Sequence, residues 1–172
     1  RHLPLFIQVA EGLKNENPQI QFILGVTNKL NLDNFSFPKW IQIETEQPKK
    51  ALECADVALV ASGSATLEAS IYGTPMIIIY KMAIFSWWLT KMLVKTDYAG
   101  MVNIIAGKKI MPEYLQNKAT VKSITKEAFE IISSTKKQKK MKSELFNVQQ
   151  KLQGKGASQR AAEHILSLTQ SR

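Results

Sequence analysis

The sequence predicts an α/β domain with a doubly wound parallel sheet followed by a helical C-terminal tail. Two apolar runs, at 57–61 and 75–80, flank a segment with helical spacing, and neither run alternates with polar residues. Such runs are typical of parallel strands covered on both faces. Strand and helix patterns alternate up to about residue 115, whereas 116–172 carries only helical patterns. This order predicts one βαβ unit within a larger α/β sheet and an all-helical end.

Length and composition indicate one globular domain spanning 1–172. The chain has 172 residues, of which 45% are hydrophobic and 22% are charged. A chain of this size buries a sizeable core. Its single cysteine, Cys54, excludes an internal disulfide and any multi-cysteine metal site. We expect Cys54 to be a small buried core residue and not a nucleophile.

The positive charge is concentrated near the C-terminus. The net charge is +9, and residues 117–172 hold 12 Lys and Arg against 4 Asp and Glu. A basic tail suggests an anionic surface such as nucleic acid or acidic lipid. The alternative is that the lysines at 136–140 form a solvated helix face.

The first elements can be predicted in order along the chain. Apolar residues recur at helical spacing over 3–15, and Asn-Pro at 17–18 stops this helix. A strand follows at 20–26. The alternation at 40–43 predicts a short edge strand, and 49–55 predicts a short helix.

The elements after the βαβ unit are mostly helical. Phe85–Lys95 shows an amphipathic helical pattern, and 100–107 is an apolar segment bounded by glycines with one polar residue, Asn103. A lone asparagine in such a run is usually a buried amide with its hydrogen bonds satisfied, although beside a ligand it could serve that ligand. Pro112 is expected to begin a short helix. Three further helices are predicted at 121–133, 137–153 and 157–168.

The turn inside the βαβ unit is the candidate ligand site. Every side chain from Ser62 to Thr66 is small or hydroxylic, so the backbone N–H groups that open the next helix are uncovered and suit an anion. Glu68 follows within that helix, where a carboxylate suits the hydroxyls of a ribose better than phosphate. Alternatively, the turn is an ordinary βα loop with Ser64 or Thr66 as the helix N-cap. Gly63 is its only glycine, so this is not the dinucleotide fingerprint.

Several segments together resemble a known family. These are 61–68 with the small-residue turn, 75–81, 88–91, 94–98, 103–107 and 112–116. In this order they resemble the lipid-A-disaccharide synthase family, and the resemblance covers most of the chain. It implies a Rossmann-like domain that is one half of a GT-B architecture, with 1–172 as the nucleotide-sugar donor-binding domain and 116–172 as its helical tail.

The resemblance also implies an activity. The family is made of inverting hexosyltransferases that move 2,3-diacylglucosamine from UDP to 2,3-diacylglucosamine 1-phosphate, which forms the lipid A disaccharide and releases UDP. No metal or other cofactor is implied. Matched onto this sequence, the donor would be held by nine residues. They are Ser62, Gly63, Ser64, Ala65 and Thr66 at the diphosphate, Glu68 at the ribose, Lys81 at the phosphate, and Asn103 and Gln116 on the donor side of the cleft.

Two positions depart from the family pattern. The residue after Tyr80 is usually arginine and is Lys81 here, which keeps the charge but loses the two-pronged contact to phosphate. The residue before Asn103 is commonly proline and is Val102 here, so that segment is less constrained. The family's general base belongs to the N-terminal acceptor domain, which is expected to be missing from this chain. The isolated chain is therefore expected to be inactive.

The resemblance sets the expected partners. They are UDP-diacylglucosamine, diacylglucosamine 1-phosphate, the chain's own N-terminal domain, a possible second copy and the inner face of the inner membrane of a Gram-negative bacterium, reached from the cytoplasm. No nucleic acid is expected. Two alternatives stay open: another GT-B enzyme such as a UDP-sugar 2-epimerase or the peptidoglycan glucosaminyltransferase, or a basic nucleic-acid-binding module without enzymatic activity.

Overall fold

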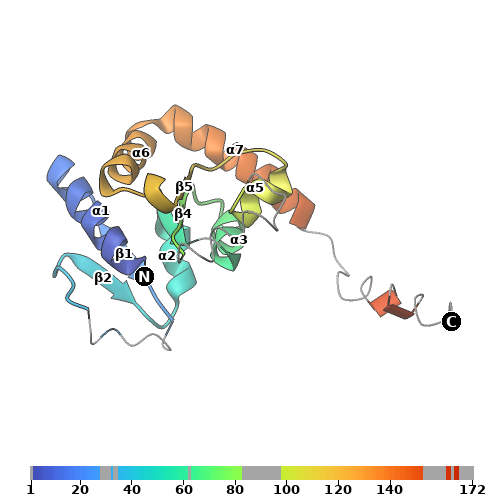
Figure 1. Cartoon of the computed structure of the whole chain (residues 1–172), viewed down its shortest axis with the longest axis horizontal. Helices are drawn as coiled ribbons and strands as arrows, with labels where there is room; N and C mark the ends of the chain where they lie inside the picture. Colours follow the sequence, from blue (N-terminus) through green and yellow to red (C-terminus); the bar gives the residue numbers. More distant parts are fainter. Residues whose placement is uncertain are drawn as a thin grey trace.

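The computed structural model of the chain describes residues 2–27, 32, 35–61, 63–82, 98–152, 162–163 and 165–166. Within these residues, parallel strands pair into a two-stranded and a three-stranded sheet, and helices connect them (Figure 1). The predicted fold class, an α/β arrangement with parallel strands and a helical end, is confirmed.

The first three elements follow the sequence prediction closely. Helix α1 (Leu3–Glu16) has Pro4 in its first turn, where a missing N–H costs nothing. It is followed by strand β1 (Phe22–Gly25) and strand β2 (Ile41–Glu44), which pair in parallel from Phe22 opposite Ile41. Among the described strands β2 pairs with β1 alone, so the predicted edge strand is confirmed.

Helix α2 (Pro48–Cys54) confirms the predicted short helix but not the burial of its cysteine. Cys54 is the last residue of α2 and is exposed. The prediction that it is a buried core residue was therefore wrong. The reason is that α2 buries none of its residues fully. The small apolar side chains at its end therefore do not mark a core-facing stripe.

The predicted βαβ unit is confirmed. Strand β3 (Ala58–Ala61), helix α3 (Ser64–Ile71) and strand β4 (Met76–Tyr80) follow one another, and β3 pairs in parallel with β4. The four apolar side chains at 76–79 are fully buried. Burial of such side chains contributes roughly 2 kcal/mol each, which explains why this run is the centre of the core.

The segment after Pro112 is a strand and not the predicted helix. Helix α5 (Met101–Ala106) is followed by strand β5 (Glu113–Leu115), which pairs in parallel with β4, and by the 3-10 helix η1 (Gln116–Lys118). Proline fits the start of a helix, but it equally fits a place before a strand where no N–H is needed. Its carbonyl accepts a hydrogen bond from Ile78 N–H at 2.9 Å, so the β4–β5 pairing begins at the proline itself.

The C-terminal helices confirm the predicted tail in part. Helix α6 (Val121–Ser133) has the predicted bounds, and its N-cap Thr120 accepts a hydrogen bond from Ser123 N–H at 3.2 Å. Helix α7 (Thr135–Leu152) corresponds to the helix predicted at 137–153, but it begins two residues earlier and ends one residue earlier. The helix predicted at 85–95 lies outside the described residues. That predicted at 157–168 lies largely outside them, with helical backbone at 162–163 and 165–166.

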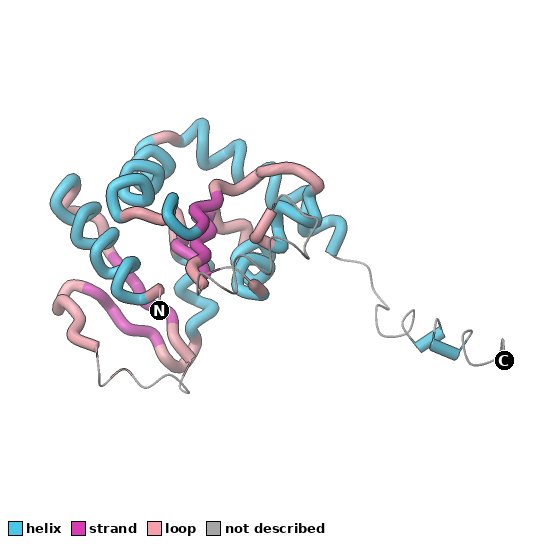
Figure 2. Tube along the Cα trace, viewed as in Figure 1, coloured by secondary structure: helices cyan, strands magenta, loops and turns pink. Residues whose placement is uncertain are grey.

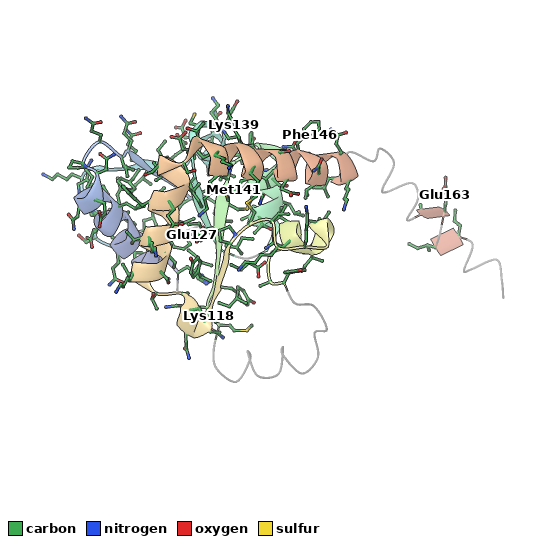
Figure 3. All side chains as sticks on the ribbon, turned by 90° about the horizontal axis from the view of Figure 1, so that it is seen from above. Lys118, Glu127, Lys139, Met141, Phe146 and Glu163 are labelled. Atoms are coloured by element: carbon green, nitrogen blue, oxygen red, sulfur yellow. The ribbon has the colours of Figure 1, made fainter. Side chains whose placement is uncertain are left out.

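The strands lie between two groups of helices. Helices α1 and α6 pack together on one side of the three-stranded sheet, and α3 and α5 lie on the other, as Figures 1 and 2 show. Helix α7 contacts α3, α5 and α6. In Figure 3, Met141 points from α7 into the molecule, whereas Lys139 and Phe146 lie on its outer side. Met141 is 6% exposed and Phe146 is 57% exposed, so α7 covers the core with one face only.

Helix α7 lies at the edge of the sheet where the strands begin. Gln149 Nε2 donates hydrogen bonds to the carbonyls of Ser70 and Ile71, which form the end of α3. Lys108, which precedes β5, pairs with Glu144 of α7 at 2.7 Å. Because α3 starts at the carboxyl ends of the strands and ends at the opposite edge, α7 is distant from those carboxyl ends.

A polar network joins β5, α6 and the start of α7. Tyr114 donates its hydroxyl hydrogen to Glu127 Oε2 at 3.0 Å, and Lys137 Nζ lies 2.8 Å from Glu127 Oε1 and 3.0 Å from Glu130 Oε2. Burial, followed by the hydrogen bond to Glu127, raises the pKa of Tyr114 to about 12. The Lys137 hydrogen bond lowers the pKa of Glu130.

We expect the tyrosine of this network to make stability fall at high pH. The pKa of Tyr114 is raised from 10.0 to about 12, so the neutral phenol contributes stability below pH 10 that is lost as the pH rises to about 12. Tyr114→Phe should cost roughly 1 kcal/mol at neutral pH, as one partly exposed hydrogen bond. Urea unfolding of both proteins from pH 8 to about pH 12 checks this. A difference between them that does not shrink above pH 10 would contradict the assignment.

Candidate functional site

The candidate site lies where three parallel strands end. Strands β3, β4 and β5 are neighbours in that order and run in the same direction, so their carboxyl ends meet at one edge of the sheet. Gly63, Lys81 and Gln116 follow these three ends closely in the chain. Ligands of open α/β sheets bind beyond such ends. The structure therefore brings the Gly63 turn, Lys81 and Gln116 to one edge, called here the rim, whereas Ser62 lies outside the described residues.

Gly63 determines the shape of the turn at the end of β3. Its φ of 124° and ψ of −154° belong to a region that is essentially restricted to glycine. Its carbonyl accepts hydrogen bonds from Thr66 N–H at 3.1 Å and from Thr66 Oγ1 at 2.8 Å. A Cβ built on Gly63 meets nothing within 4 Å. The glycine is thus required by the backbone conformation, while the space beside it is open.

The opening turn of α3 presents uncovered amides. Gly63 is the N-cap, without a side-chain cap, so the alternative in which Ser64 or Thr66 caps the helix is wrong. Ser64 and Ala65 are exposed, and the described residues supply no acceptor for their N–H groups. The Thr66 hydroxyl is buried and bonded to Gly63. The geometry can accept an anion at the amides of Ser64 and Ala65, with Thr66 holding the turn.

Glu68 lies one turn further along α3, on the side of α2. Its Oε1 is 3.9 Å from Lys49 Nζ, and its side chain is 41% exposed. An exposed pair at this distance contributes little to stability. The carboxylate is therefore accessible to a ligand that extends from the turn toward α2.

Lys81 and the residue after it are held by hydrogen bonds from other elements. Lys81 N–H donates to His2 Nε2 at 2.9 Å, at the start of α1. Met82 N–H donates to Gln116 Oε1 at 3.2 Å, and Gln116 Nε2 donates to the Met82 carbonyl at 3.4 Å. Gln116 adopts a φ of 48°, a left-handed conformation that is uncommon outside glycine. Its side chain thus continues the β4–β5 pairing beyond the end of β5, which fixes the backbone that carries Lys81.

Asn103 has a structural environment and does not face the rim. Its side chain is fully buried. Its Nδ2 donates to the Met111 carbonyl at 2.9 Å and to Glu113 Oε1 at 2.7 Å, and its Oδ1 accepts from the N–H groups of Ile110 and Met111, both at 2.9 Å. All donors and acceptors of the amide are used. No part of the amide is left for a ligand in this structure. That Asn103 lines the donor side of the cleft stays a prediction.

Other polar residues that the sequence did not single out lie near Lys81. Gln8 of α1 and Asn117 of η1 share a hollow with Lys81 and Gln116. No local pattern marks them, since exposed amides on a helix and a turn are common. Only the packing of α1 beside α6 brings them together.

The described part of the chain offers no metal centre. No group of three or more His, Cys, Asp and Glu side chains there is arranged to hold a metal ion. Among the helices that the structure describes, none has both the length and the apolar character needed to cross a membrane.

The rim combines the ends of parallel strands with a glycine turn, open helix amides and a lysine. This arrangement resembles that of the α/β domains that bind nucleotides. Comparison with known proteins narrows this class. The family model described as Lipid-A-disaccharide synthetase matches residues 1–166. The chain belongs to this family.

Curated relatives agree with the family match. A lipid-A-disaccharide synthase of Syntrophus aciditrophicus is 34% identical over 174 residues, which cover 98% of this chain and 45% of the relative. Those of Nitrosococcus oceani and of a Sulfurihydrogenibium species are 30% and 33% identical, and the matches cover 44% and 47% of their lengths. The chain thus spans less than half the length of these relatives.

Proposed function

We propose that this chain is the donor-binding half of a hexosyltransferase that moves 2,3-diacylglucosamine from UDP to 2,3-diacylglucosamine 1-phosphate. Family membership and the names of the curated relatives support the lipid A disaccharide as the product. The observation that carries the proposal is the rim, where the Gly63 turn and Lys81 follow the ends of neighbouring strands and Glu68 lies one turn along α3. The epimerase, the peptidoglycan glucosaminyltransferase and the nucleic-acid-binding module are not favoured by the family match.

In the proposed reaction, the acceptor hydroxyl attacks the anomeric carbon of the donor from the face opposite to UDP, so the configuration inverts. The anomeric C–O bond breaks and UDP leaves with the electron pair. The amides of Ser64 and Ala65 and the ammonium of Lys81 stabilise the charge that grows on the diphosphate. The ammonium and the helix amides supply positive charge from the protein itself, so the proposed mechanism needs no metal. The general base is proposed to belong to the acceptor half, and this chain alone is proposed to be inactive.

The proposal assigns different tasks to the other rim residues. Glu68 binds the ribose hydroxyls, because its accessible carboxylate lies one turn beyond the diphosphate amides and would repel phosphate. Gly63 and Thr66 shape the diphosphate turn. Ser62 is proposed to bind the diphosphate. Gln116 positions Lys81 through its hydrogen bonds to Met82. We further propose that the protein works at the cytoplasmic surface of the inner membrane, together with its N-terminal domain and a second copy, without nucleic acid.

Calorimetry with nucleotides tests the proposed function. We expect the chain to bind UDP more tightly than ADP or GDP. Glu68→Ala should weaken UDP binding roughly tenfold, as expected for lost hydrogen bonds to a charged group, and leave inorganic pyrophosphate binding unchanged. Glu53→Ala, which removes an exposed carboxylate from α2, is the matched control. Equal binding of the three nucleotides would contradict a uridine-specific donor site, and unchanged UDP affinity in Glu68→Ala would remove the ribose role.

A further inference from the structure

A hollow of about 420 Å³ opens beside Lys81, on the side of α1 and α6. Its size falls within the range of about 300–1,000 Å³ that is typical of small-ligand sites. Four apolar and five polar residues line it. They are Leu5, Met82, Ala119 and Val121, and Gln8, Lys81, Gln116, Asn117 and Thr120.

The polar residues of the hollow are of two kinds. The side chains of Gln116 and Thr120 already have hydrogen-bond partners. Gln116 bonds to the Met82 backbone, and the Thr120 hydroxyl bonds to the Ser123 hydroxyl. The side chains of Gln8, Lys81 and Asn117 have no hydrogen-bond or ion-pair partner among the described residues. Two amides and one ammonium that converge on a hollow offer both donors and acceptors, which suits a neutral ligand rich in hydroxyl and amide groups.

The order of the strands gives the rim a direction. The Gly63 turn follows β3, Lys81 follows β4, and Gln116 follows β5, with neighbouring strands about 4.8 Å apart. Glu68 and its neighbour Lys49 lie on the α2 side of the turn. A ligand whose diphosphate binds at the turn and whose ribose meets Glu68 would therefore extend in the other direction, past Lys81, and enter the hollow.

We propose that this hollow binds the hexosyl group of the nucleotide-sugar donor. The inference rests on the proposed function and adds the orientation of the donor along the rim. The amides of Gln8 and Asn117 bind ring hydroxyls or the carbonyl of an amide substituent. Leu5, Met82 and Val121 face the C–H surface of the sugar. Lys81 lies between the diphosphate and the sugar, where it contacts the phosphate nearer to the hexose.

Binding of UDP and of UDP-N-acetylglucosamine by the chain and its variants tests the proposal. The double variant Gln8→Leu with Asn117→Ala should bind UDP like the unaltered chain and lose roughly tenfold in affinity for UDP-N-acetylglucosamine, as expected for two neutral hydrogen bonds. Gln150→Leu with Asn147→Ala is the matched control, because both amides are exposed on α7 at the opposite edge of the sheet. Circular dichroism confirms that both double variants remain folded.

The outcomes separate the proposal from the proposed function. If the unaltered chain binds neither compound, the proposed donor site is refuted, and the sugar subsite that depends on it is refuted as well. If it binds UDP but the double variant loses nothing for the nucleotide sugar, the proposed function stands and the hexosyl subsite is refuted. The same follows if UDP and UDP-N-acetylglucosamine lose affinity equally, because the amides would then act on the nucleotide.

Discussion

Replacing Asn103 by leucine should destabilise the chain by more than about 3 kcal/mol, since each buried polar group left without a partner costs about 1–3 kcal/mol. Leucine has a similar size but satisfies none of the four groups that the amide serves. These are the N–H groups of Ile110 and Met111, the Met111 carbonyl and the Glu113 carboxylate. Glu113 also accepts hydrogen bonds from the Gly100 and Ala99 N–H groups, so the loss extends to the start of α5.

Chemical denaturation followed by circular dichroism measures this effect. Asn147→Leu provides the control, because Asn147 is exposed on α7. That variant should stay within about 0.5 kcal/mol of the unaltered chain, as surface substitutions usually do. Should Asn103→Leu unfold at the same denaturant concentration as the control, the buried network would not hold α5 to β5 as the structure indicates.

Gly63→Asn should lose about 1–3 kcal/mol of stability and most of the UDP affinity, because asparagine cannot adopt the Gly63 backbone conformation without strain. The φ of 124° and ψ of −154° require the absence of a Cβ even though no atom lies within 4 Å of its position. A change in this backbone displaces the amides of Ser64 and Ala65 that follow it.

Gly107 provides a matched comparison. It has a φ of 71° and a ψ of 10°, also with open space around it, at the C-terminal end of α5. Asparagine adopts this left-handed conformation readily, so Gly107→Asn should be nearly neutral for stability and for UDP binding. Thermal unfolding compares the stability of the two variants, and calorimetry compares their affinity for UDP. Similar losses in both would show that the particular conformation of Gly63 is not what the turn requires.

The parts of the fold that were predicted correctly have strong local signals. Helix α6 has an apolar stripe at helical spacing and a threonine cap, so its bounds 121–133 agreed with the structure. Strand β4 is an unbroken apolar run between a turn and a charged residue. The errors arose where one residue type fits two settings. Pro112 suits a helix start as well as a strand start, and the small apolar residues around Cys54 occur on exposed helices as well as in cores.

The candidate site was predictable only where it lies in one stretch of sequence. The Gly63 turn and Glu68 belong to a single βα junction, whose spacing is visible in the chain. The hollow beside Lys81 combines α1, the end of β4 and the start of α6, which are distant in sequence. The buried setting of Asn103 depends likewise on where β5 lies, and that strand was expected to be a helix. Tertiary packing decides such placements, and local patterns carry little information about it.

The division of the strands between two sheets gives the molecule two levels of local stability. In β4 the side chains at 76–79 are fully buried, so its amide protons exchange with solvent mainly when the whole domain unfolds. The two-stranded sheet of β1 and β2 leaves Ile23 45% and Ile43 43% exposed, and a pair of strands is only marginally stable by itself. Opening of that pair therefore needs less free energy than global unfolding. Fluctuations concentrate there, while the three strand ends of the rim stay anchored in the more protected sheet.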